Sequence, residues 1–145
     1  MTSIQMKTLI SSIKPCQGPS VFIASPYTLG DPAINARIQL DAWNYLFEHG
    51  FTPVAPLQAH FQHIAHPRPY EDWIAYALWQ LKQCKYCYRI DGESSGADNE
   101  LANAERWNIK IATSLPQLFQ MAGITAPDVF PDFHRAYRDA LPKLA

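Results

Sequence analysis

A short loop that runs into a helix carries the residues best suited to chemistry. Residues 91–100 read DGESSGADNE and connect an apolar run to a helix expected to start at Asn99. Free backbone N–H groups and the helix dipole favour a phosphate there, with the Ser94 and Ser95 hydroxyls as further donors. The same field favours an ionised Glu100 in the first turn, facing a cleft, and an ionised carboxylate can be a nucleophile. Helix capping alone would also explain most of this loop.

Histidines and cysteines form a second group of candidate ligands. His60 and His63 are three residues apart with His66 nearby, and Cys84 and Cys87 share the same spacing. These spacings would suit zinc if the fold brought the two pairs together. Against zinc, Cys84 ends an expected helix and Cys87 enters an apolar strand, where small buried thiols are common. We therefore expect no metal ion, and we expect the histidines to contact substrate or solvent.

Strand and helix patterns alternate along the chain and must position these residues. The apolar runs predict strands at residues 20–25, 51–55, 86–90 and 109–112, and helical spacing predicts helices at 34–46, 70–81, 99–107 and 115–122. This order predicts a small Rossmann-like (flavodoxin-like) α/β domain, with a parallel sheet of four to five strands covered by helices on both faces. The loops at 25–30, 56–69 and 91–98 should then surround one cleft at the carboxyl edge of the sheet. Residues 57–69 show no convincing period and are expected to be an irregular, mobile lid.

The expected organisation has three parts. Residues 1–19 are an N-terminal arm or short helix, residues 20–115 the α/β domain, and residues 116–145 a helical extension with a last helix at 132–141. The apolar side chains of the extension exceed what we expect one small core to hold. They predict a homodimer or larger assembly, and the alternative is a tail that folds back on its own sheet.

Composition excludes several classes of protein. Twelve Lys and Arg against 13 Asp and Glu give a net charge of -1, so long nucleic acid is a poor partner. No apolar stretch approaches the roughly 18 to 20 residues that span a bilayer. No secretion signal is evident, and three cysteines suit a reducing compartment better than a disulfide framework, so we expect a cytoplasmic protein without membrane contact.

Taken in order and spacing, part of the chain resembles the nucleoside 2-deoxyribosyltransferase superfamily, which includes the 2-deoxynucleoside 5-monophosphate N-glycosidases. The resemblance spans about residues 20–112. It rests on the run FIASPY at residues 22–27, on Asn35, Gly50 and Asp72, and on the pattern Ser94-x-Gly96-x-x-x-Glu100.

The resemblance implies roles for three residues. Glu100 would attack C1 of the sugar and form a glycosyl-enzyme intermediate while the base leaves. Asp72 would help to protonate or orient the base, although a first-turn carboxylate also simply suits a helix dipole. Tyr27 would hydrogen-bond the nucleophile or the sugar, and it could equally be a turn residue that covers the cleft.

The resemblance also bears on phosphate. Family members that hydrolyse monophosphates carry Ser at the position of Ser94, where transferases tend to carry Asp, and Gly96 matches a close backbone approach to the ligand. Asp98 departs from the usual second glycine, and its carboxylate would oppose a phosphate unless it points away as a helix cap. Ser25 and His60, in the loops around the expected cleft, are further candidates for binding substrate.

The function expected from these features is cleavage of the N-glycosidic bond of a nucleoside or deoxynucleoside 5-monophosphate, without a metal or organic cofactor. One alternative is transfer of the sugar to a second base. Another is a nucleotide-binding sensor module that uses the same cleft without turnover.

Overall fold

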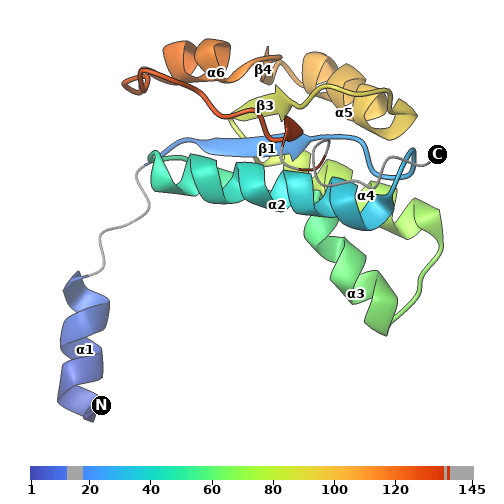
Figure 1. The fold of residues 1–145 in the computed structure, drawn as a ribbon. Helices are drawn as coiled ribbons and strands as arrows, with labels where there is room; N and C mark the ends of the chain where they lie inside the picture. The colour runs from blue at the N-terminus through green and yellow to red at the C-terminus, as the bar shows by residue number, and fades with distance from the viewer. Residues whose placement is uncertain (13–17, 136, 138–145) are drawn as a thin grey trace.

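The computed structural model describes residues 1–12, 18–135 and 137, with side chains described for residues 1–7, 18–135 and 137. Strands and helices alternate as the sequence predicts (Figure 1). In chain order the elements are α1 (Ser3–Ser12), β1 (Ser20–Ala24), α2 (Pro32–Glu48), β2 (Thr52–Val54), the 3-10 turn η1 (Pro56–Gln58), α3 (Ala59–Ala65), α4 (Tyr70–Lys82), β3 (Tyr86–Arg89), α5 (Ser95–Arg106), β4 (Lys110–Ala112) and α6 (Leu115–Ala122).

The strands of the described chain form one four-stranded parallel sheet with the order β2-β1-β3-β4. Val21 of β1 lies beside Pro53 of β2 on one side and Tyr86 of β3 on the other. The predicted Rossmann-like α/β class is therefore confirmed. The chain leaves β1 toward β2 and later returns to its other side at β3, and in such sheets this switch point is where ligands bind.

Side chains alternate between two faces of the sheet, and each face packs against a pair of helices. Val21 and Ile23 point to the core under α2 and α6, whereas Phe22 and Ala24 point to the core under α4 and α5. Figure 1 shows the sheet enclosed between these helices. Both faces of the sheet are covered by helices and excluded from water, which explains why the strand sequences are nearly continuous apolar runs.

The ends of α2 follow the signals in the sequence. Asp31 caps the helix by accepting hydrogen bonds from the backbone N–H groups of Ala33 and Ile34. At the other end Gly50 has a φ of +91°, a conformation that glycine adopts without strain and that turns the chain into β2.

Two predicted boundaries are wrong. Residues 57–69 are not wholly irregular, since they contain the end of η1 and all of α3. Helix α3 has only seven residues and none of them is buried, so the segment is too short for a helical period to be recognised in the sequence. Helix α5 begins at Ser95 rather than Asn99, because Ser94 is its cap and the small residues of its first turn carry no helical pattern.

The described part of the C-terminal extension, which is residues 116–135 and 137, folds back on its own domain. The Phe130 ring lies 5.1 Å from that of Phe119 in α6, the Phe133 ring 5.9 Å from that of Tyr45 in α2, and the Tyr137 hydroxyl donates to Asp41 at 2.5 Å. The argument that one monomer lacks room for these side chains is therefore wrong, and assembly stays a prediction without that support. The predicted helix at 132–141 falls largely outside the described residues.

No helix of the described chain is long and apolar enough to cross a bilayer.

Candidate active site

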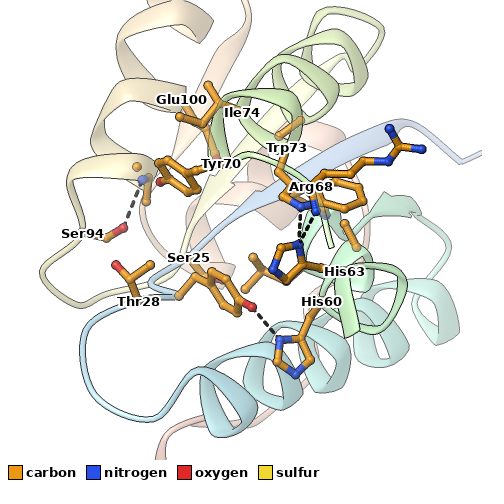
Figure 2. Close-up of a pocket in the computed structure, with 17 residues that line it drawn as sticks. Ser25, Thr28, His60, His63, Arg68, Tyr70, Trp73, Ile74, Ser94 and Glu100 are labelled. Atoms are coloured by element: carbon orange, nitrogen blue, oxygen red, sulfur yellow. Dashed lines mark hydrogen bonds between the residues drawn. The ribbon is translucent and has the colours of Figure 1, made fainter. Parts of the chain in front are cut away.

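A pocket opens at the carboxyl edge of the sheet, where the loops after β1, β2 and β3 meet (Figure 2). Helices α3 and α4 form its remaining wall. The side chains and backbone that line it are those of Ser25, Tyr27, Thr28, Pro56, Leu57, Ala59, His60, His63, Arg68, Tyr70, Trp73, Ile74, Ala77, Ser94, Gly96, Ala97 and Glu100. The structure thus brings together six of the eight residues proposed from the sequence, and the two outside this pocket are Asp72 and Ser95.

Glu100 lines the pocket from α5. It is the sixth residue of α5, so it belongs to the second turn of the helix rather than the first. Its Oε2 is buried and has no hydrogen-bond partner among the described residues. Burial raises the pKa of the Glu100 carboxyl to about 8, and the nearby Arg89 guanidinium only partly opposes this. The helix dipole was expected to favour the ionised form of Glu100, but the loss of hydration on burial outweighs that effect and favours the protonated form.

The start of α5 supplies the groups proposed for an anion. Ser94 is the N-cap, and its Oγ accepts a hydrogen bond from the Ala97 backbone N–H at 3.1 Å. The backbone N–H groups of the first turn, at Ser95 and Gly96, have no acceptor within the helix. A Cβ on Gly96 would lie 3.3 Å from the Tyr70 hydroxyl, so glycine keeps this approach open. The side chain of Ser94 therefore caps the helix and lines the pocket at once.

Ser95 lines a neighbouring pocket on the far side of Tyr70. That pocket also contacts Gly96, Asn99 and Glu100. Glu100 therefore lines two neighbouring pockets, and Tyr70, Ile74 and Gly96 line both of them as well.

Asp98 points away from the pocket. Its carboxylate accepts a hydrogen bond from the Arg89 guanidinium at 3.1 Å, and the side chain is 70% exposed. Arg89 also donates to the carbonyl oxygens of Ile90 and Gly92, and so fastens the loop between β3 and α5. Asp98 therefore points away from the pocket as that expectation requires, although it does so by pairing with Arg89 and not as the helix cap, which is Ser94.

Tyr27 and His60 face each other across the mouth of the pocket. The Tyr27 hydroxyl and Nδ1 of His60 share a hydrogen bond of 2.6 Å, shown in Figure 2. The backbone around Tyr27 is fixed by Asn35, whose Nδ2 donates to the carbonyl oxygens of Tyr27 and Leu29. Tyr27 therefore bonds to His60 rather than to Glu100 in this structure.

A buried glutamine ties two of the loops together. Gln39 of α2 donates to the Ile23 carbonyl at 2.9 Å and to Ser25 Oγ at 2.8 Å, while its Oε1 accepts from the Leu57 backbone N–H. Gln39 is 1% exposed. The sequence analysis did not identify Gln39. The signal was present, because Gln39 is a polar residue at a core position of the helix, one turn from both Ala36 and Ala42.

Asp72 does not reach the pocket. It lies exposed in the first turn of α4, the position that suits a carboxylate near a helix N-terminus. Its catalytic role stays a prediction from the resemblance. Arg68 and Thr28 do line the pocket but were not singled out, because each stands in a segment without helical or strand periodicity.

The histidines and cysteines considered as zinc ligands do not form a metal site in the described chain. Within the described chain no three His, Cys, Asp or Glu side chains lie close enough to hold a metal ion. His60 is bonded to Tyr27, and burial raises the pKa of the Cys84 thiol to about 11 and of Cys87 to about 12. A thiol must lose its proton to ligate zinc, so these two are poor ligands where they stand.

Fold and site together define an α/β protein with a pocket at the switch point of a parallel sheet, containing a buried carboxyl group. Comparison of the chain with family models, with curated proteins and with solved structures found no match in any of the three.

Proposed function

We propose that this protein cleaves the N-glycosidic bond of a nucleoside or deoxynucleoside 5-monophosphate in the cytoplasm, releasing the free base and a sugar phosphate. The observation that carries the proposal is Glu100 in the second turn of α5, which lines the pocket and has a buried Oε2 with no hydrogen-bond partner among the described residues. Burial of an unpaired carboxyl is costly, and such groups cluster at functional sites.

The proposed reaction has two displacements at C1 of the sugar. The ionised Glu100 attacks C1, the C1–N bond breaks, and both of its electrons leave with the base. A water molecule then attacks C1 of the resulting ester, the bond from C1 to the Glu100 oxygen breaks, and the proton that the water loses neutralises the departed base, directly or through solvent. The backbone N–H of Gly96 and the Ser94 side chain hold the phosphate, and Tyr27, Ser25 and His60 contact the rest of the substrate.

Two other functions use the same pocket. A deoxyribosyltransferase would need only that a second base outcompete water for the ester. A sensor module would bind the nucleotide without turnover, and its affinity would survive replacement of Glu100.

A substrate panel tests the proposal. The protein is incubated with nucleosides and their 5-monophosphates, in the ribose and 2-deoxyribose series, and free base is measured by chromatography. Release from a monophosphate supports hydrolysis, and base exchange in the presence of a second base supports transfer. No release from any compound would reject both enzymatic functions.

Ser94→Asp is expected to lower the preference for monophosphates over nucleosides by at least about tenfold, because a carboxylate would repel the phosphate. Asp caps helices as well as Ser does, so α5 should keep its start. Ser114→Asp, which makes the same change at the cap of α6 and away from the pocket, is the matched control. The measurement is kcat/KM for a nucleoside and its monophosphate, and an unchanged ratio would contradict the role of Ser94.

We further propose that the protein forms a homodimer or larger homo-oligomer. A sheet of four strands has few loops to exclude water from the pocket, and displacement at C1 benefits from a closed site. The aromatic side chains of Tyr76 and Trp79 on α4 are 52% and 66% exposed and offer an apolar surface beside the pocket. Light scattering should give a multiple of 16.4 kDa, and a mass at the single-chain value would reject assembly.

A further inference from the structure

His63, on α3, is held by two N–H groups that reach the same ring nitrogen. The Trp73 indole Nε1–H donates to Nδ1 at 2.8 Å, and the Arg68 backbone N–H donates to it at 3.3 Å (Figure 2). An indole N–H and a backbone N–H can only donate hydrogen bonds. Nδ1 is therefore the unprotonated nitrogen, and the single ring proton of neutral His63 lies on Nε2.

The protonated nitrogen is available to a ligand. Nε2 of His63 makes no hydrogen bond with the described part of the chain, and the residue lines the same pocket as Glu100. The Trp73 ring meets the imidazole edge to face, with centroids 5.8 Å apart. Figure 2 shows His63 on α3 and Glu100 on α5 at separate sides of the pocket. The pocket thus has a carboxyl on one side and an oriented N–H donor on another.

We propose that His63 binds the leaving base, with its Nε2–H donating a hydrogen bond to an acceptor atom of the base, either a ring nitrogen or a carbonyl oxygen. Trp73 is the positioning residue that fixes the proton on Nε2. This inference rests on the function proposed above.

The donor acts on the charge that develops during the first displacement. As the C1–N bond breaks, its electron pair moves into the ring system of the base, and negative charge grows on the acceptor atoms. A fixed N–H at such an atom stabilises the transition state more than the ground state. His63 gives up no proton, because loss of its single ring proton would leave an imidazolate anion, and the base takes its final proton from water.

Three other candidates from the sequence already make hydrogen bonds within the protein, through the Tyr27 hydroxyl, Nδ1 of His60 and Oγ of Ser94. Tyr27 and His60 are bonded to each other, and Ser94 caps α5. Asp72, to which the resemblance gives the role of assisting the base, is exposed and does not line the pocket. In this proposal His63, and not Asp72, assists the departure of the base, and it does so through a hydrogen bond.

Two substrates whose leaving groups differ in how much assistance they need to depart test the role of His63. On a 2-deoxynucleoside 5-monophosphate, His63→Leu should lower kcat about 100-fold, the usual effect of removing such a donor. On the 4-nitrophenyl glycoside of the same sugar phosphate the loss should be much smaller, because nitrophenolate leaves without help. His63→Gln, which places an amide N–H near the position of Nε2, should recover part of the rate on the nucleotide. Equal losses on both substrates, or full activity of His63→Leu, would overturn the proposal.

The ring proton can be located without any turnover. Long-range 1H–15N spectra of histidine-labelled protein should show a protonated Nε2 and an unprotonated Nδ1 for His63, and Trp73→Phe should give a mixture of the two forms. A proton on Nδ1 in the wild-type protein would overturn the proposal. Its failure is distinguishable from that of the function above, since wild-type protein that releases no base rejects the reaction itself, whereas active wild type with unimpaired His63→Leu rejects His63 alone.

Discussion

Glu100→Gln is expected to reduce base release at least about 1,000-fold while leaving the fold intact, because a neutral amide cannot attack C1. The substitution changes neither the length nor the branching of the side chain, so the pocket keeps its shape. The measurement is single-turnover formation of free base from the best monophosphate of the panel. Residual binding of that monophosphate would show that the loss lies in chemistry rather than in recognition.

Glu105→Gln is the matched control for this experiment. Glu105 lies on the same helix, α5, and is exposed to solvent, so the chemical change is identical while the pocket is untouched. Its activity should stay within a factor of about two of the wild type. Turnover by Glu100→Gln at the wild-type rate would reject the nucleophile, and with it the enzymatic proposal in this form.

The order of strands and helices could be predicted because each strand is buried on both faces and each main helix has an apolar stripe. Residues 86–90 and the helix that starts at Tyr70 are examples, and the structure places both within a residue of the prediction. Helix α3 could not be predicted in the same way. Its histidines are held by side-chain hydrogen bonds rather than by apolar packing, and such bonds leave no periodic signal.

The candidate site, like the fold, could be predicted only in part from the sequence. The cleft loops followed from the topology, since the carboxyl ends of parallel strands share one edge, and Ser94, Gly96 and Glu100 were found there. The ionisation of Glu100 was misjudged, because a sequence shows the helix dipole but not the depth of burial. The bond from Trp73 to His63 joins residues ten positions apart on two helices, and no spacing rule indicates it.

Burial of Glu100 has a consequence for stability as well as for chemistry. The pKa of its carboxyl is raised from 4.5 to about 8 in the folded protein. Below pH 4.5 the group is protonated in both the folded and the unfolded chain and has no effect on the pH dependence. Between pH 4.5 and 8 the unfolded chain releases the proton while the folded chain retains it, so the free energy of unfolding falls as pH rises.

Glu100→Gln removes this dependence, and the variant should therefore gain stability relative to the wild type as pH rises. The gain should grow to roughly 5 kcal/mol in all as the pH rises from below 4.5 to above 8, following about 1.4 kcal/mol for each unit of pKa shift, and should level off above that range. Urea unfolding of wild type, Glu100→Gln and Glu105→Gln at pH 5, 6.5 and 8 measures it, and Glu105→Gln should differ from wild type by a nearly constant amount. A difference between Glu100→Gln and wild type that does not change with pH would contradict the buried, proton-retaining carboxyl.

The same ionisation that prepares Glu100 for attack is thus expected to weaken the fold, so base release should rise with pH over the range in which stability declines.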